Sequence, residues 1–94
     1  MRERVVEKHL KDQVKLAGGK AYKCVWPGTN GCPDRVVLWP NRLDWVELKR
    51  PATPDAEEHQ LRKHAELRAS GQTVFVLPTK EDVDQYIQLR TVKW

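Results

Sequence analysis

Apolar residues near the start of the chain recur every three or four positions, which is the spacing of an amphipathic helix. We place this helix over Arg2–Leu16. The pair Gly18-Gly19 would end it, because glycine readily adopts the left-handed conformation of a helix C-terminus. The predicted inner stripe consists of Val6, Leu10, Val14 and Ala17.

Three short runs rich in apolar and β-branched residues follow, separated by turn residues. They predict strands over Tyr22–Trp26, Arg35–Trp39 and Leu43–Lys49. A glycine-rich segment around Pro27-Gly28 joins the first two runs, and Pro40-Asn41 joins the last two. The glycine-rich segment fits either a plain hairpin loop or a loop that approaches a phosphate backbone closely.

Side chains alternate between the two faces of a strand, so the third run divides into two sets. One set comprises Leu43, Trp45, Glu47 and Lys49, and the other comprises Asp44, Val46 and Leu48. We expect the set with leucine and tryptophan to face the core. Charged groups at the end of a buried face are costly unless they are paired or bind an ion.

The second half of the chain predicts a helix, a strand and another helix. Thr53-Pro54 begins a helix that extends over Glu57–Ala69, and Gly71 caps it. Thr73–Leu77 is short and apolar, and its place after a helix predicts a parallel crossover onto the sheet. Thr79 is the expected cap of the last helix.

The order of elements is helix, three strands, helix, strand, helix, which predicts an α/β fold with one domain over residues 1–94. We expect an apolar inner stripe on each of the two later helices. The stripe of the earlier helix is Leu61, Ala65, Ala69 and Leu67, and that of the last helix is Val83, Tyr86, Ile87 and Arg90.

Composition narrows the class of protein without specifying an activity. The chain has 94 residues, 32% of them charged, and a net charge of +4, which suits one globular domain with a mild preference for polyanions. No apolar run reaches the ~18 residues of a membrane helix. The charged N-terminus is unlike a signal peptide, so we expect a cytoplasmic protein.

Cys24 and Cys32 lack zinc-site spacing, and in a reducing compartment we expect half-buried thiols rather than a disulfide.

Two acids and a lysine gather at the ends of the two central runs. Asp34 heads one run, while Glu47 and Lys49 end the next. A hairpin centred between Pro40 and Asn41 would place Asp34 across from Glu47, roughly 5 Å apart at Cβ. Proline cannot take the positive φ of a type I′ turn, so we expect a longer, bulged loop that makes the pair diagonal. Two carboxylates and an ammonium in one patch suit a divalent cation held against a phosphate.

Each candidate residue also has a structural interpretation. The two acids and the lysine could form an ordinary salt-bridge cluster at the rim of the sheet. Glu7 fits a surface pair with Lys11, one helical turn away. On pattern alone, we expect His64 to be a partly exposed surface histidine and Gln60 to face solvent.

The sequence Pro33-Asp34, followed by a hairpin and then Glu47-Leu48-Lys49, resembles the PD-(D/E)xK nuclease signature, and αβββαβ is the core of that superfamily. More narrowly, the chain resembles the VRR-NUC family in its small stand-alone form. Gly31 before the Pro-Asp pair, Pro51 after the lysine and Gln60 in the next helix support this resemblance, which spans nearly the whole chain.

The resemblance implies a Mg²⁺-dependent nuclease that also accepts Mn²⁺. It implies that Asp34 and Glu47 ligate the metal and that the backbone carbonyl of Leu48 adds a further ligand. Lys49 would position or deprotonate the attacking water and steady the charge that builds on the phosphate.

The same resemblance implies two more polar site residues, Glu7 on the side of a second metal and Gln60 beside the acids. Stand-alone members resemble Holliday junction resolvases, which implies a homodimer that cuts branched DNA, without an organic cofactor or a membrane partner. We expect the protein to be bacterial or phage-encoded. The basic residues expected to contact phosphates are Lys20, Lys23, Arg35, Arg42, Arg50, Arg62 and Lys63.

Two other interpretations stay open. One is a nucleic-acid-binding module without catalysis, in which the acids and the lysine are only a salt-bridge cluster. Carboxylates on a phosphate-facing surface repel DNA unless a metal is bound, which weakens this interpretation. The other is a small protein-interaction domain with tryptophan anchors, although tryptophans in such numbers more often belong to a core or an interface.

Overall fold

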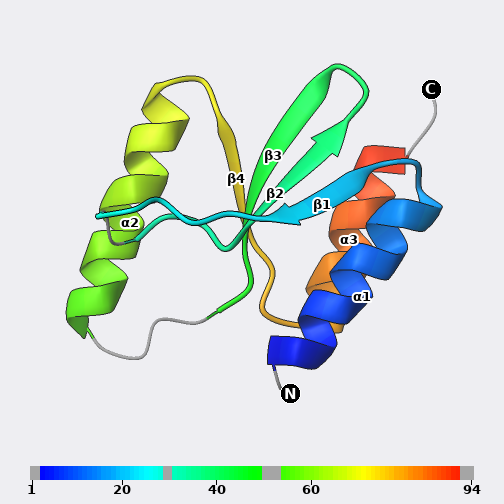
Figure 1. The fold of residues 1–94 in the computed structure, drawn as a ribbon, viewed down its shortest axis with the longest axis horizontal. Coiled ribbons are helices and arrows are strands. Elements are labelled where there is room, and N and C mark those ends of the chain that lie inside the picture. The colour runs from blue at the N-terminus through cyan, green and yellow to red at the C-terminus, as the bar shows by residue number, and fades with distance from the viewer. Residues whose placement is uncertain (1–2, 29–30, 50–53, 92–94) are drawn as a thin grey trace.

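The part of the chain that the computed structural model describes, residues 3–28, 31–49 and 54–91, forms three helices and a four-stranded sheet (Figure 1). The order confirms the predicted αβββαβ arrangement with a C-terminal helix. In chain order the elements are α1 (Glu3–Leu16), β1 (Lys20–Lys23), β2 (Arg35–Trp39), β3 (Arg42–Glu47), α2 (Pro54–Ala69), β4 (Thr73–Val76) and α3 (Lys80–Thr91). Arg2, Arg50, Pro51 and Thr53, which entered the predictions, lie outside the described residues.

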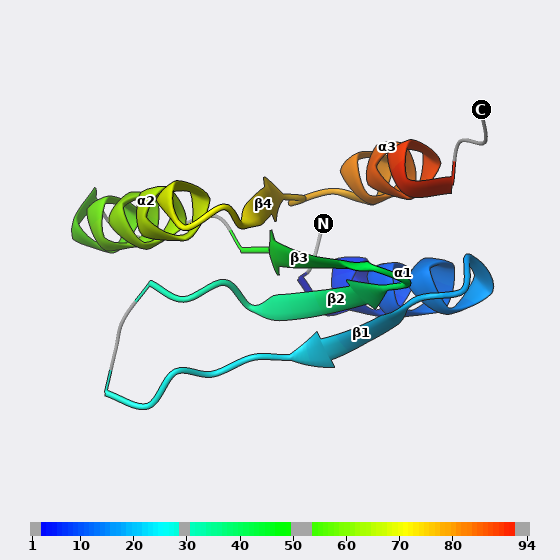
Figure 2. The same ribbon diagram turned by 90° about the horizontal axis from the view of Figure 1, so that it is seen from above.

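The sheet lies between two layers of helices, with α1 and α3 on one side and α2 on the other (Figures 1 and 2). Its strand order is β1-β2-β3-β4. The first three strands are antiparallel, and β4 runs parallel to β3, as the crossover prediction requires. None of the helices in the described ranges is long and apolar enough to cross a membrane.

The hairpin of β2 and β3 turns tightly at Pro40-Asn41. Trp39 pairs with Arg42, so only two residues form the turn and the expected longer, bulged loop is wrong. Asn41 has φ of 64°. A proline with its fixed negative φ, followed by a positive φ, is the pattern of a type II turn, in which asparagine is well tolerated. The tight turn fixes the register of the two strands that carry the candidate acids.

The residues predicted to cap the helices are found at the helix ends. Gly18 and Gly71 have φ of 95° and 85° and follow the ends of α1 and α2. At both ends the next residue donates its N–H to a carbonyl five residues earlier, at 2.9 Å, which closes a Schellman motif. At the start of α3, Thr79 and Asp82 exchange side-chain-to-backbone hydrogen bonds in a capping box.

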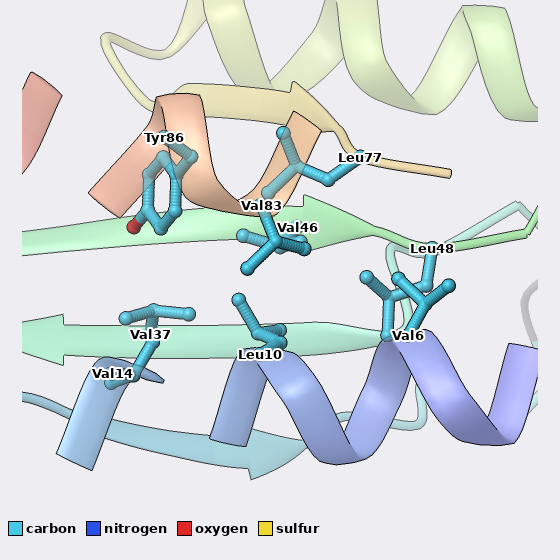
Figure 3. Close-up of a cluster of buried hydrophobic side chains, with 9 residues drawn as sticks. All are labelled: Val6, Leu10, Val14, Val37, Val46, Leu48, Leu77, Val83 and Tyr86. Atoms are coloured by element: carbon cyan, nitrogen blue, oxygen red, sulfur yellow. The ribbon is translucent and has the colours of Figure 1, made fainter. Parts of the chain in front are cut away.

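The hydrophobic core lies between the sheet and the layer formed by α1 and α3 (Figure 3). Within the described residues, α2 contributes no side chain to this cluster. All predicted positions of the α1 stripe except half-buried Ala17 are buried, as are Val83 and Tyr86 of α3. The cluster consists of Val6, Leu10, Val14, Val37, Val46, Leu48, Leu77, Val83 and Tyr86.

The prediction of which face of β3 meets this core is wrong. Leu43 is exposed and Trp45 is half-buried, whereas Asp44, Val46 and Leu48 are buried. The cause is a buried polar network that allows Asp44 to occupy the core face. Its carboxylate accepts hydrogen bonds from Arg90 at 2.7 and 3.0 Å and from the hydroxyl of Tyr86 at 2.5 Å.

The inner face of α2 also differs from the prediction. Leu61 is 58% exposed, and Ala65 and Ala69 are exposed as well, although Leu67 is half-buried. His64 is buried, so the expected surface histidine is wrong. The helix turns polar residues inward because it packs against the end of the sheet where β3 carries Glu47.

Candidate active site

The register of the central hairpin brings Asp34 and Glu47 together. Arg35 pairs with Val46, so continuing the ladder by one residue sets Asp34 opposite Glu47. One carboxylate oxygen of Asp34, Oδ2, accepts backbone N–H groups from Leu48 at 3.1 Å and Lys49 at 3.3 Å. These two bonds hold the Asp34 carboxylate against the end of β3. The exposed Lys49 follows Glu47 by two residues, as the candidate motif requires.

Glu47 is an unusual acid because its side chain is almost completely buried. The residue is only 2% exposed. Its pKa is raised to about 8, first by burial and then by a hydrogen bond and charge repulsion from the adjacent Asp34, while a hydrogen bond from Gln60 acts in the opposite direction. The pair therefore retains a proton at neutral pH unless a cation replaces it.

Helix α2 supplies the remaining wall of the site through Gln60 and His64. Gln60 is half-buried and hydrogen-bonds to Glu47, so it does not face open solvent. The Nε2 atom of His64 lies 3.9 Å from a carboxylate oxygen of Glu47. Burial lowers the pKa of His64, so at neutral pH both groups are uncharged and the contact is not an ion pair. The one-turn spacing of the two residues is the signal that could have placed them on one face.

Glu7 and Arg35 form an ion pair on the other side of the sheet. Arg35 is 5% exposed, so the prediction that it contacts phosphate is wrong; its guanidinium also approaches the carbonyl of Asp34 at 3.4 Å. In the described ranges no three acid, histidine or cysteine side chains form a metal-binding group. Glu7 therefore reaches the acid pair only indirectly, through Arg35.

The other predicted phosphate contacts are spread over the molecule. Lys23 lies opposite Arg35 in the strand register, at the end of the sheet that carries the acids. Lys20 and Arg42 lie near the hairpin turn at the opposite end. All three are exposed. On α2, Arg62 and Lys63 pair with acids of their own helix, and Arg50 lies outside the described residues. Cys24 and Cys32 are free and half-buried, as expected.

The acid pair has the chemistry of a site for a hard divalent cation. It offers two adjacent carboxylates, one of them fixed by backbone N–H groups, and Mg²⁺ prefers such oxygens while keeping several of its waters. The raised pKa of Glu47 shows that the pair carries less negative charge than its two acids can supply. A cation would relieve this repulsion.

Acids contributed by two antiparallel strands of an αβββαβ fold, with a lysine two residues after the second acid, define the PD-(D/E)xK class. No protein-family model matches the sequence. A protein of Acyrthosiphon pisum secondary endosymbiont phage 1, named "Putative nuclease p44", is 45% identical over 82 residues, which are 86% of this chain and 87% of that protein. A solved structure described as a VRR_NUC domain superposes with a TM-score of 0.80 at 33% identity, covering 92% of this chain and 94% of that one. The chain belongs to the VRR-NUC family of nucleases.

Proposed function

We propose that this protein is a metal-dependent endonuclease that hydrolyses phosphodiester bonds in DNA at the Asp34–Glu47 pair. The observation that carries the proposal is the buried Glu47 beside Asp34, with its pKa raised to about 8. An acid in this position weakens the fold, because burying it beside a second acid costs free energy unless it keeps a proton or binds a cation. Strongly perturbed acids of this kind are typical of functional sites.

Asp34, Glu47 and the backbone carbonyl of Leu48 would hold Mg²⁺, with Mn²⁺ as a substitute. When bound, such an ion lowers the pKa of a coordinated water and offsets the charge that develops on phosphate. The two backbone N–H bonds to Asp34 leave its other oxygen available for this task. Glu7 acts at a distance in this proposal, through its ion pair with Arg35, whose guanidinium lies beside the carbonyl of Asp34.

Lys49 and Gln60 would complete the site from two directions. The ammonium group of Lys49 suits a phosphate oxygen or the attacking water as a compact charge. Gln60 donates to Glu47 and so selects which carboxylate oxygen turns toward the reacting groups. The reaction is an in-line attack of water on phosphorus, with the 3′ or 5′ oxygen as leaving group.

We further propose that the substrate is branched DNA and that two copies of the chain act together. A four-way junction is resolved by two symmetric cuts, and a twofold dimer supplies two identical sites. Support comes from one face of the sheet, where Tyr22, Leu38 and Leu43 are exposed apolar residues. The strand registers place all three on the face that also carries Trp45.

The test is cleavage of a labelled four-way junction and a supercoiled plasmid with Mg²⁺, with Mn²⁺ and with EDTA. We expect metal-dependent cleavage, and a loss of at least about 100-fold in Asp34→Asn, Glu47→Gln and Lys49→Met, because each removes a charge from the reacting centre. Far-UV circular dichroism confirms that the variants are folded. Glu81→Gln and Lys15→Met change exposed residues of the same types and should leave the rate unchanged.

The outcomes separate the two levels of the proposal. Wild-type protein that binds DNA but cuts nothing in either metal is a nucleic-acid-binding module, and the catalytic proposal is then wrong. Full activity in the three site variants would show that the chemistry takes place elsewhere. Cleavage of plasmid without symmetric cutting of the junction would keep the nuclease and reject junction resolution.

A further inference from the structure

The loop that leads into Asp34 presses directly on the backbone of α2. Gly31 has φ of +87°. A Cβ atom placed on it would lie 2.7 Å from the carbonyl oxygen of His59, 2.9 Å from the carbonyl carbon and 3.1 Å from Cγ of Lys63. Two of these three neighbours belong to a helix backbone, which cannot rotate aside. Any side chain at this position must therefore move the loop and α2 apart.

Helix α2 is held against the sheet by contacts outside the hydrophobic core, among them a hydrogen bond from Arg68 to the carbonyl of Val74 at 3.0 Å. The helix contributes no residue to the hydrophobic core among the described residues. Its most deeply buried side chain, His64, has a ring nitrogen, Nε2, without a hydrogen-bond partner in the described part of the chain. A buried polar atom in that state costs free energy, so it does not draw the helix toward the sheet.

The contact at Gly31 links both halves of the candidate site. Gly31 stands three residues before Asp34, and His59 stands directly before Gln60. Moving the helix away from the loop therefore withdraws Gln60 from Glu47, while the Asp34 carboxylate remains fixed by its two backbone N–H bonds.

We propose that Gly31 is a positioning residue, whose missing side chain allows α2 to approach closely enough for Gln60 to hold Glu47. The inference rests on the proposed function for its kinetic consequence, although the position of Gln60 can be measured without any cleavage. Gly31 itself touches no reacting group.

The test variant is Gly31→Ala, and the protein offers a matched control. Gly28 also has a positive φ, +74°, but a Cβ there would meet no atom within 4 Å. Gly28→Ala thus carries the same kind of backbone strain without the contact on α2. In the described part of the chain, no residue of the loop or of α2 belongs to the core cluster, so we expect both variants to fold.

The kinetic expectation is a fall in kcat of roughly 10- to 100-fold in Gly31→Ala with little change in KM, because small misplacements near the chemistry have effects of this size. Gly28→Ala should stay within about twofold of wild type. Adding Gln60→Ala to Gly31→Ala should cause little further loss, because both changes remove the same contact. The proposal would be overturned if Gly31→Ala and Gln60→Ala reduced kcat additively, or if Gly31→Ala and Gly28→Ala had equal rates.

The second readout is the side-chain amide resonance of Gln60 in a ¹⁵N spectrum recorded without metal, assigned by its loss in Gln60→Glu. We expect this signal to shift toward the value of an exposed glutamine in Gly31→Ala and to stay in place in Gly28→Ala. An unmoved signal in both variants overturns the proposal even if activity falls. If the signal shifts in Gly31→Ala but the wild type never cleaves DNA, the positioning role is supported and the nuclease is rejected.

If Gly31→Ala does not fold, Gln60→Asn provides an independent test. It shortens the side chain by one methylene and so mimics withdrawal of the helix without touching the loop. Its kcat should fall as predicted for Gly31→Ala, and an unchanged kcat would show that the distance between Gln60 and Glu47 is immaterial.

Discussion

At the scale of single residues, two buried acids show how surroundings decide the state of a carboxyl group. Asp44 is fully buried, but Arg90 and Tyr86 compensate its charge with three hydrogen bonds, and the bond to Asp44 raises the pKa of Arg90 in turn. Glu47 is buried to almost the same degree, with another acid beside it and a neutral histidine behind it. Asp44 therefore serves the fold, and Glu47 is left in need of a proton or a cation.

This difference predicts an unusual dependence of stability on pH. Folded Glu47 keeps its proton up to about pH 8, whereas the ordinary value is 4.5. Between these values the folded state binds more protons than the unfolded state, so its stability falls as pH rises and levels off above the upper value. Glu47→Gln cannot ionise, so its free energy of unfolding should rise relative to that of wild type as pH increases across this window. The difference should be on the order of a few kcal/mol.

Urea denaturation in EDTA at several pH values measures the difference. Subtracting the wild-type curve from the Glu47→Gln curve removes the other titrating groups, which both proteins share. Parallel curves would show that Glu47 ionises normally. Adding Mg²⁺ at high pH should stabilise wild type and leave Glu47→Gln nearly unchanged, because only the wild type keeps the full acid pair.

At the scale of elements, hydrophobic periodicity and turn chemistry account for most of what the sequence could predict. The stripe of α1, the glycine caps and the Thr79–Asp82 box are local signals, and β2 and the parallel placement of β4 follow from short-range patterns. The first strand was expected over Tyr22–Trp26 and lies instead at Lys20–Lys23; the other mistakes concern the face that a strand or helix turns to the core and the length of the hairpin turn. Which side of a strand or helix turns toward the core depends on partners that are distant in sequence, and a local sequence pattern carries no information about those partners.

Helix α2 and strand β3 illustrate this limit. Leu61 and Ala65 form an apolar stripe, yet they face outward because the sheet end opposite the helix carries Glu47, which attracts Gln60 instead. Leu43 and Trp45 look like core residues, yet Asp44 displaces them because Arg90 arrives from α3, 46 residues later. The acid pair itself was predictable, since Pro40-Asn41 sets the register locally.

Leu10 and Leu61 differ in burial, so truncating each of them tests how α1 and α2 pack. Leu10 of α1 is fully buried in the core, whereas Leu61 of α2 is 58% exposed. Leu10→Ala should lower the free energy of unfolding by about 2–5 kcal/mol, because it leaves a cavity in the core. Leu61→Ala should change it by no more than about 0.5 kcal/mol. Denaturant melts of both variants measure this; equal losses would mean that α2 packs with its apolar stripe inward.

At the scale of the whole molecule, the two faces of the sheet have separate tasks. The face toward α1 and α3 holds the hydrophobic core, and the face toward α2 carries the acid pair. That second face also leaves Tyr22, Leu38 and Leu43 exposed. Apolar side chains gathered on one surface are typical of contacts between proteins.

The exposed apolar face predicts self-association through the sheet. If two copies meet there, Leu38→Glu should convert a dimer into a monomer, because it brings charges into an apolar contact. Leu16→Glu, at an exposed leucine at the end of α1, is the matched control and should remain dimeric. Light scattering at micromolar concentration measures the mass. A monomeric wild type, or a dimer that survives Leu38→Glu, would rule out this interface.

The separation of α2 from the hydrophobic core has an evolutionary consequence. Substitutions on α2 and on the described part of the loop that leads into Asp34 should lower the stability of the domain little, because the described core side chains lie on the other face of the sheet. Descendants of this protein can thus accommodate differently shaped substrates by altering one helix while they inherit the same scaffold. Such drift is limited mainly at Gly31, where any added carbon meets the helix backbone.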